Sequence, residues 1–301
     1  MNTSAPPRDQ VRAKKVTQTT EPPMDRPSEP TDMMKFSAGS DIQRLDDGSM
    51  IERLSDALVE NSGRLLLIHG YLNNAEIRAA YDPMITEARA AGWRGEIYGA
   101  VWDGGNPLAK IKTIAKKIAW SLVPIPGPRP LLIPLRLGYT VYQIRRYWMD
   151  ACARADQCGQ ALGRYVCDEP RNDGRPPWTV AAHSLGCRVA FEAMKRASLE
   201  SPSPVFNHVL LFGGAVSTTS DWNQTQQTVS HRIVNCFSTN DQVLRFFFKL
   251  AHWQNPIGRC SISSGDQNIC NHDCSEKVPN HFAYHKSLQD VLRVILADEL
   301  T

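Results

Sequence analysis

Ser184 stands in the pentapeptide Ala182-His-Ser-Leu-Gly186, with a small residue two positions before the hydroxyl and another two positions after it. A serine held on a sharp turn between a strand and a helix presses those two neighbours together, so both must be small. The same turn aims the backbone N–H of Leu185 and the start of the helix at a developing oxyanion. The pattern therefore predicts a nucleophilic serine. The competing interpretation is that Ser184 only caps the helix that follows it.

The segments on either side of this serine alternate between strand and helix patterns. Short apolar runs, typical of strands buried on both faces, occupy residues 64–69, 95–102, 178–183, 208–212 and 232–237. Helical apolar periodicity occupies residues 82–91, 141–166, 186–197 and 284–300. The first of these helices is expected to begin at the N-cap Asp82, with Pro83 at its first helical position. Strands that alternate with helices predict an α/β fold whose mostly parallel central sheet is covered by helices on both faces.

A serine at such a strand-to-helix junction makes the chain similar to the α/β-hydrolases over roughly residues 60–300. This superfamily contains esterases, lipases and thioesterases that use a serine nucleophile. The sequence departs from the commonest motif at Ala182, where glycine is usual, although alanine is also small. His183, which adjoins the serine, is expected to be structural, and so is His69.

The resemblance implies a carboxylate and then a histidine downstream of the serine. Asp241 is the only carboxylate directly after the strand at 232–237, so it is the expected acid. Its other interpretation is an N-cap for the apolar segment 243–250. His281 precedes the final helix, where the superfamily places its base, and the competing candidate is His285, which lies inside that helix.

A loop that supplies backbone N–H groups to an oxyanion is expected after the first core strand. The sequence there reads His69-Gly70-Tyr71-Leu72, and a His-Gly pair followed by an aromatic residue is frequent in the oxyanion loops of the superfamily. Gly70 lets the backbone approach a substrate closely. The N–H of Tyr71 or Leu72 is expected to complete the oxyanion hole together with the N–H of Leu185.

The bulk composition argues against several classes of protein. With 301 residues and a net charge of +3, the chain has no basic excess that would indicate a nucleic-acid partner. Its start lacks the apolar core of a signal peptide, and no run reaches the ~20 apolar residues of a membrane span. A cytoplasmic location is therefore expected, with peripheral membrane association and non-classical export left open.

The eight cysteines are expected to be reduced, because four of them occupy apolar positions of predicted core elements: Cys152, Cys158, Cys187 and Cys236. The segment 270–274, Cys-Asn-His-Asp-Cys, resembles a metal site but lacks a second pair of ligands, so it is interpreted as a strand with incidental thiols. The sequence contains no glycine-rich phosphate loop. We expect neither a metal nor a cofactor.

The chain is expected to consist of a disordered tail, residues 1–34, and a single α/β domain, residues 35–301. Residues 107–139 leave the second core strand as a helical and proline-rich insertion, and they are predicted to form a lid or cap. The first part of this insertion, residues 108–122, has an apolar face with its lysines largely elsewhere. Two interpretations stay open: a cap helix packed over the core, or an element that docks on a membrane or on an acyl chain.

The function expected from these residues is hydrolysis of a carboxylic ester or thioester through an acyl-enzyme, with an apolar acyl group as one option. The expected partner is a small-molecule or lipid-like ester. Residues 107–139 are the candidate for peripheral membrane contact. Two alternatives use the same fold: a catalytically silent binding or scaffold protein, and an acyltransferase with the same three residues.

Overall fold

The structure is a computed structural model that describes residues 42–70, 77–104, 132–169, 176–263 and 268–298. All the described elements belong to one compact unit, Ser37–Thr301. The predicted tail, residues 1–34, and most of the predicted lid, residues 107–139, lie outside the described ranges. Both therefore remain predictions.

A mostly parallel sheet forms the centre of this unit. Its strands are β1 (Ile42–Arg44), β2 (Met50–Ser55), β3 (Arg64–Ile68), β4 (Glu96–Val101), β5 (Trp178–His183), β6 (Phe206–Phe212), β7 (Val229–Phe237) and β8 (Ile269–Asp273). Within the described residues they pair in the order β1-β2-β4-β3-β5-β6-β7-β8. The pairings β1–β2 and β2–β4 are antiparallel, and all pairings from β4 to β8 are parallel. The predicted fold class is confirmed.

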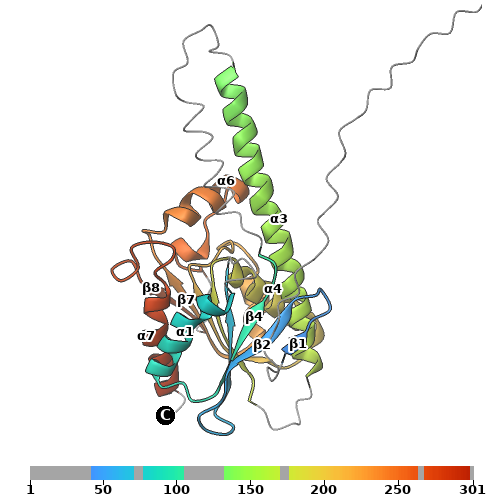
Figure 1. The fold of residues 1–301 in the computed structure, drawn as a ribbon, viewed down its shortest axis with the longest axis vertical. Coiled ribbons are helices and arrows are strands. Elements are labelled where there is room, and N and C mark those ends of the chain that lie inside the picture. Colours follow the sequence, from blue (N-terminus) through green and yellow to red (C-terminus); the bar gives the residue numbers. More distant parts are fainter. Residues whose placement is uncertain (1–41, 71–76, 105–131, 170–175, 264–267, 299–301) are drawn as a thin grey trace, which may run out of the picture. The chain divides into compact units, whose positions relative to one another are not determined.

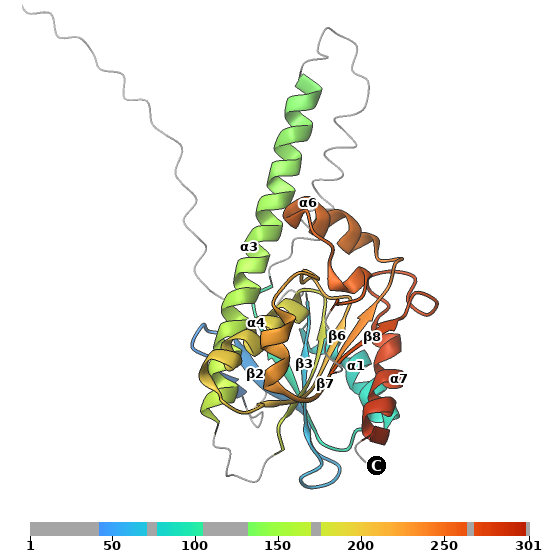
Figure 2. The same ribbon diagram turned by 180° about the vertical axis from the view of Figure 1, so that it is seen from behind.

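Long helices cover both faces of the sheet. The helices α1 (Ile77–Ala91) and α7 (His285–Asp298) lie side by side on one face (Figure 1). The helices α3 (Leu132–Asp168) and α4 (Leu185–Glu200) cover the other face, as the view from behind shows (Figure 2). Short helical segments connect β6, β7 and β8: α5 (Trp222–Thr225), the 3-10 helix η1 (Gln226–Thr228), the π-helix η2 (Leu244–Phe248), α6 (Lys249–His252) and the 3-10 helix η3 (Ile257–Arg259).

The strand β3 shows why its continuous apolar pattern requires two layers of helices. Leu66 and Ile68 pack into the core beneath α3 and α4, whereas Leu65 and Leu67 pack into the core beneath α1 and α7. All four side chains are fully buried. Each such burial contributes about 2 kcal/mol relative to an exposed side chain, so the strand is stable only between the two layers.

Two helices begin earlier than their sequence patterns predict. The helix α1 begins at Ile77 and not at Pro83, so the prediction of an N-cap at Asp82 is wrong and the proline lies inside the helix. Tertiary packing accounts for the difference: Tyr81 is fully buried, and its hydroxyl donates to the carbonyl of Ala100 at 2.7 Å. That anchor offsets the cost of a proline in the helix interior.

The helix α3 begins at Leu132, upstream of the predicted start at Val141. Pro134 lies in its first turn, where a backbone N–H has no partner within the helix, so this proline does not delay the start. The last part of the predicted lid therefore belongs to α3. Further along, the predicted apolar face is buried as expected, with Trp148, Ala151 and Ala155 at most 2% exposed.

Candidate active site

Ser184 occupies the sharp turn between β5 and α4. Its backbone angles are φ 58° and ψ −119°, a conformation unfavourable for any residue other than glycine. Its N–H donates to the carbonyl of Phe212 at 3.0 Å, and its own carbonyl accepts from Ala215 at 3.0 Å and from Cys187 at 3.1 Å. Strain of this kind, on the order of 1–3 kcal/mol, persists only where neighbouring contacts enforce it, and such positions cluster at functional sites.

The hydroxyl of Ser184 distinguishes a nucleophile from a helix cap. It makes no capping hydrogen bond to the described helix α4. It lies instead 2.7 Å from Nε2 of His281, and it donates this hydrogen bond when the imidazole carries its proton on Nδ1. The side chain is also 3% exposed, so solvent does not compete strongly for this bond. The geometry is that of a presented hydroxyl and not that of a cap.

Small residues around the turn allow the backbones to approach one another. A Cβ on Gly70 would lie 2.6 Å from the Cβ of Ser184, and a Cβ on Gly186 would lie 2.3 Å from the carbonyl oxygen of Ile68. Real Cβ atoms do not approach other atoms so closely, so both positions require glycine. Ala182 is fully buried, and the turn forms with its methyl group in place.

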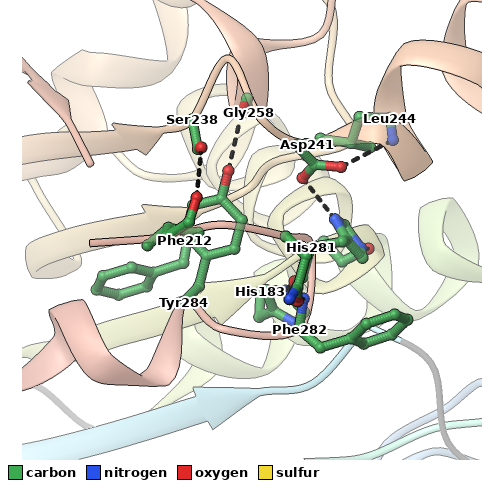
Figure 3. Close-up of polar contacts among 12 residues, drawn as sticks. His183, Phe212, Ser238, Asp241, Leu244, Gly258, His281, Phe282 and Tyr284 are labelled. Carbon is green, nitrogen blue, oxygen red and sulfur yellow. Dashed lines mark hydrogen bonds and ion pairs between the residues drawn. The ribbon is translucent and has the colours of Figure 1, made fainter. Parts of the chain in front are cut away.

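Asp241 uses its two carboxylate oxygens for two different tasks. One oxygen accepts from Nδ1 of His281 at 2.6 Å, and the other accepts from the backbone N–H of Leu244 at 3.0 Å (Figure 3). The carboxylate is fully buried. Asp241 therefore caps the helical segment before η2 and also holds the imidazole of His281, and its role as the catalytic acid remains a prediction.

His281 lies in the loop between β8 and α7, and its carbonyl is held by a second histidine. Nε2 of His183 donates to that carbonyl oxygen at 2.9 Å, which links the residue before Ser184 to the loop of His281. The two imidazoles are 5.0 Å apart between ring centroids. His285, at the start of α7, lies with Nδ1 3.2 Å from the carbonyl of Phe282. The hydrogen-bonded chain of described residues therefore runs from Ser184 through His281, and not through His285, to Asp241.

The other two imidazoles beside His281 are held in the neutral form. Burial lowers the pKa of His69 to about 4, with a further contribution from the charge of His281. Burial lowers the pKa of His183 well below its usual range, again with a contribution from the charge of His281. The rings of His69 and His183 meet edge to face at 5.9 Å. If His281 becomes protonated, the two neighbouring imidazoles are therefore neutral and do not repel its positive charge.

A cavity of about 350 Å³ opens beside Ser184 and His281. Its lining includes His69 and His183, but most of the wall is apolar or aromatic. The apolar part comes from α1, α3, the segment around η2, the loop before α7, and α7 itself, with Met84, Trp148, Val243, Phe247, Phe282 and Leu288. A concave apolar site with a few convergent polar groups is the usual form of a small-molecule site.

The expected oxyanion donors are described only in part. Leu185 is the first residue of α4, so its N–H is among the free donors at a helix N-terminus. Tyr71 and Leu72 lie outside the described residues, which end at Gly70 and resume at Ile77. Gly70 itself lies against the turn of Ser184. The contribution of Tyr71 and Leu72 remains a prediction.

The structure adds contributions that local sequence patterns do not signal. The sequence predicted His183 only as a structural neighbour of Ser184, but its ring positions the backbone of His281. Trp148, Val243 and Phe247 follow ordinary apolar helix patterns and yet line the cavity. No local sequence pattern could have identified these residues as part of the site, because each comes from a segment of the chain distant from Ser184.

The strand order, the antiparallel first strands and the serine turn between β5 and α4 define an α/β-hydrolase fold. The chain belongs to the family described as "Protein of unknown function (DUF726)", whose model matches residues 111–298.

Several known proteins are similar to this chain. An uncharacterized membrane protein of Schizosaccharomyces pombe is 26% identical over 226 residues, which are 72% of this chain and 28% of that protein. The Saccharomyces cerevisiae protein named "Probable lipase MIL1" is 28% identical over 240 residues, covering 77% of this chain and 22% of that protein. The chain thus spans about a quarter of the length of these curated relatives. No helix in the described part of the chain is long and apolar enough to cross a membrane.

Among solved structures, an alpha-beta serine hydrolase homologue from Coxiella burnetii is similar to this chain. The match has a TM-score of 0.42 at 13% identity and covers 88% of this chain and 100% of that one.

Proposed function

We propose that this protein is a serine hydrolase that cleaves a carboxylic ester or thioester with an apolar acyl group. One observation carries the proposal: Ser184, His281 and Asp241 form an unbroken hydrogen-bonded chain, with distances of 2.7 Å and 2.6 Å, at a strained turn beside a cavity. The name of the probable lipase among the relatives is in line with it.

The proposed mechanism assigns one task to each of the three residues. Nε2 of His281 takes the proton of Ser184 while Oγ attacks the acyl carbonyl, and Asp241 keeps the proton of the imidazole on Nδ1. The leaving alcohol or thiol then receives the proton from His281, and the acyl group remains on Ser184. Water, activated by the same imidazole, attacks the acyl-enzyme and releases the acid. The N–H of Leu185 is the proposed donor to the oxyanion in both halves of the reaction.

The mostly apolar lining of the cavity favours a substrate whose acyl group, next to Ser184, is apolar. Its apolar wall would remove a chain of methylene groups from water, at about 0.8 kcal/mol for each one buried. Substrates with longer acyl chains should therefore have higher kcat/KM until the cavity of about 350 Å³ is filled. Very short acyl groups would leave part of that volume unused.

A fluorophosphonate probe tests the nucleophile directly, because it forms a covalent bond only with an activated serine. The wild-type protein should be labelled, and Ser184→Ala and His281→Ala should not. His285→Ala is the matched control, because its imidazole lines the same cavity but lies outside the hydrogen-bonded chain, with Nδ1 3.2 Å from the carbonyl of Phe282; it should retain labelling. Folded wild-type protein that resists the probe would show a silent hydrolase fold and overturn the proposal.

A panel of acyl esters then separates hydrolysis from transfer. Release of free acid with water as the only acceptor supports a hydrolase. If labelled protein releases no acid and passes the acyl group to an added alcohol or amine, the same three residues serve an acyltransferase.

A further inference from the structure

The segment 242–255, here called the cap segment, forms part of the cavity wall on its inner side and meets solvent on its outer side. It contains the π-helix η2 and the helix α6. Val243 and Phe247 line the cavity, whereas Phe246 is 65% exposed. A single exposed aromatic side chain is ordinary, so Phe246 is informative only where further exposed aromatic and cationic groups gather beside it.

A second exposed aromatic residue ends the cap segment. Trp253 is 82% exposed and follows the last residue of α6. Its φ of 56° lies in the left-handed region, where the helix stops. Tryptophan and phenylalanine at the ends of short amphipathic helices are typical of groups that enter the boundary between lipid headgroups and acyl chains.

The charge of the cap segment has one sign. Arg245 and Lys249 are exposed, and the printed sequence from 242 to 265 contains no aspartate or glutamate. Among the described residues neither side chain has an ion-pair partner within the salt bridges of the structure. Two unpaired cations beside two exposed aromatic rings fit an anionic, partly apolar surface.

The neighbouring stretch of α3 extends this surface. Figures 1 and 2 both show α6 beside α3, and Nε1 of Trp148 on α3 lies 3.2 Å from Nε2 of His252 on α6. One helical turn earlier, Arg145 and Arg146 are exposed, and Tyr142 is 60% exposed. Burial lowers the pKa of His252; Arg188 and, more weakly, Arg145 lower it further, while Asp156 on α3 acts in the opposite direction. Asp150 is the nearest carboxylate on α3, a turn further toward the sheet.

We propose that the cap segment and residues 142–146 of α3 dock on the surface of an anionic phospholipid bilayer. The cations face the lipid phosphates and carboxylates, and the aromatic rings enter the interface. A lipid surface fits better than an acidic protein because the exposed groups are aromatic as well as cationic. The docking surface does not depend on the proposed hydrolase activity. If both proposals hold, the bilayer lies against the wall of the acyl cavity, so the substrate is a membrane lipid ester.

Vesicle co-sedimentation tests the docking surface in the 301-residue chain that carries Ser184→Ala, so that the vesicles are not consumed. The protein should pellet with vesicles of phosphatidylcholine and phosphatidylserine and remain in solution with phosphatidylcholine alone. The double variant Arg245→Glu/Lys249→Glu should weaken binding to the anionic vesicles at least about ten-fold. The double variant Phe246→Ser/Trp253→Ser should weaken it by a similar factor without changing the net charge.

The matched controls lie at the opposite end of the sheet. Arg94, exposed before β4, and Leu199, 67% exposed near the end of α4, are changed to Glu and Ser respectively. Both control variants should bind anionic vesicles like the parent, and all variants should keep its unfolding midpoint.

Three results would overturn the proposal: no binding of the parent, equal binding to neutral vesicles, or parent-level binding by either cap variant. Parent-level binding by the aromatic variant, with loss of binding only in the charge variant, would show that the attraction to the vesicles is purely ionic and that the aromatic rings do not enter the interface. Because the readout is binding by a protein without the serine, loss of docking and loss of labelling are independent outcomes.

Discussion

Nε2 of His183 lies 2.9 Å from the backbone carbonyl oxygen of His281, and this bond ties the strand that presents Ser184 to the loop that presents its base. The two histidines are 98 residues apart in sequence. The bond between them adds a second link beside the bond between Ser184 and His281. Burial keeps His183 neutral by lowering its pKa, so the ring donates to this carbonyl without adding a charge. The bond therefore makes His183 a positioning residue.

Replacing His183 with phenylalanine should lower kcat by about ten-fold or more, with a small change in KM, because the base loses its backbone anchor. His183→Gln keeps an N–H donor of similar reach and should restore part of the rate. Steady-state kinetics on an ester substrate compare kcat and KM of His183→Phe with those of His183→Gln. His272→Gln, at an exposed position of β8, is the control. Equal kcat for His183→Phe and the wild type would remove His183 from the site.

The two oxygens of Asp241 can be separated by a pair of substitutions. Asp241→Asn retains an oxygen for the N–H of Leu244 but no longer favours the tautomer of His281 with its proton on Nδ1. Its kcat should fall by about 10³–10⁴-fold, while its free energy of unfolding changes by less than about 1 kcal/mol. Asp241→Ala should show a similar loss of rate and lose about 1 kcal/mol more stability, since the cap is also removed. Kinetics and urea unfolding measure the two effects; equal stability of both variants would exclude the capping role.

Gly70→Ala should disturb the turn of Ser184, because the added methyl group would lie 2.6 Å from the Cβ of Ser184 and 2.8 Å from the carbonyl oxygen of His183. We expect a loss of about 1–3 kcal/mol of stability together with loss of probe labelling. Gly138→Ala is the matched control: its methyl group meets nothing within 4 Å and lies in the helix α3, so it should be neutral or slightly stabilising. Thermal unfolding and labelling check both, and intact labelling in Gly70→Ala would contradict the close packing.

Stability should fall on acidification between about pH 6.5 and pH 4. The pKa of His69 is about 4 in the folded protein, against 6.5 for the free side chain, so between these values the unfolded chain binds a proton that the folded one does not. Stability from this group is complete above pH 6.5 and is lost as the pH falls toward 4; at about 1.4 kcal/mol per pKa unit, the loss is at most about 3 kcal/mol. His183 acts in the same direction, because burial also lowers its pKa.

Urea unfolding at a series of pH values measures this loss. His69→Gln should flatten the acid limb, and His272→Gln, which removes an exposed imidazole, should leave the limb unchanged. An identical acid limb in His69→Gln and wild-type protein would show that carboxylates alone account for it.

The parallel core was predictable because its strands are apolar throughout. Strands such as β3 and β5 are buried on both faces, so their composition alone distinguishes them from edge strands. The edge strand β1 and its antiparallel neighbour β2 were not predicted, since each is short, partly exposed and mixed in composition. Helix starts were predicted less well. Local rules place Pro83 at the first position of α1, but the helix begins at Ile77, where the burial of Tyr81 stabilises the extra turns.

The sequence by itself determined the residue types, their order and their positions at element boundaries: a serine between small neighbours, an acid after a strand and a histidine before the last helix. Those features are local, because they depend on turn sterics and on apolar periodicity. Only the tertiary structure decided that His281 and not His285 contacts Ser184, that Asp241 both caps a helix and holds the imidazole, and that His183 anchors the loop. The cap that Asp241 forms is local, but the contacts of His281 with Asp241, Ser184 and His183 join residues 40, 97 and 98 positions apart. The distances between these residues follow from how strands and helices pack, which no local pattern encodes.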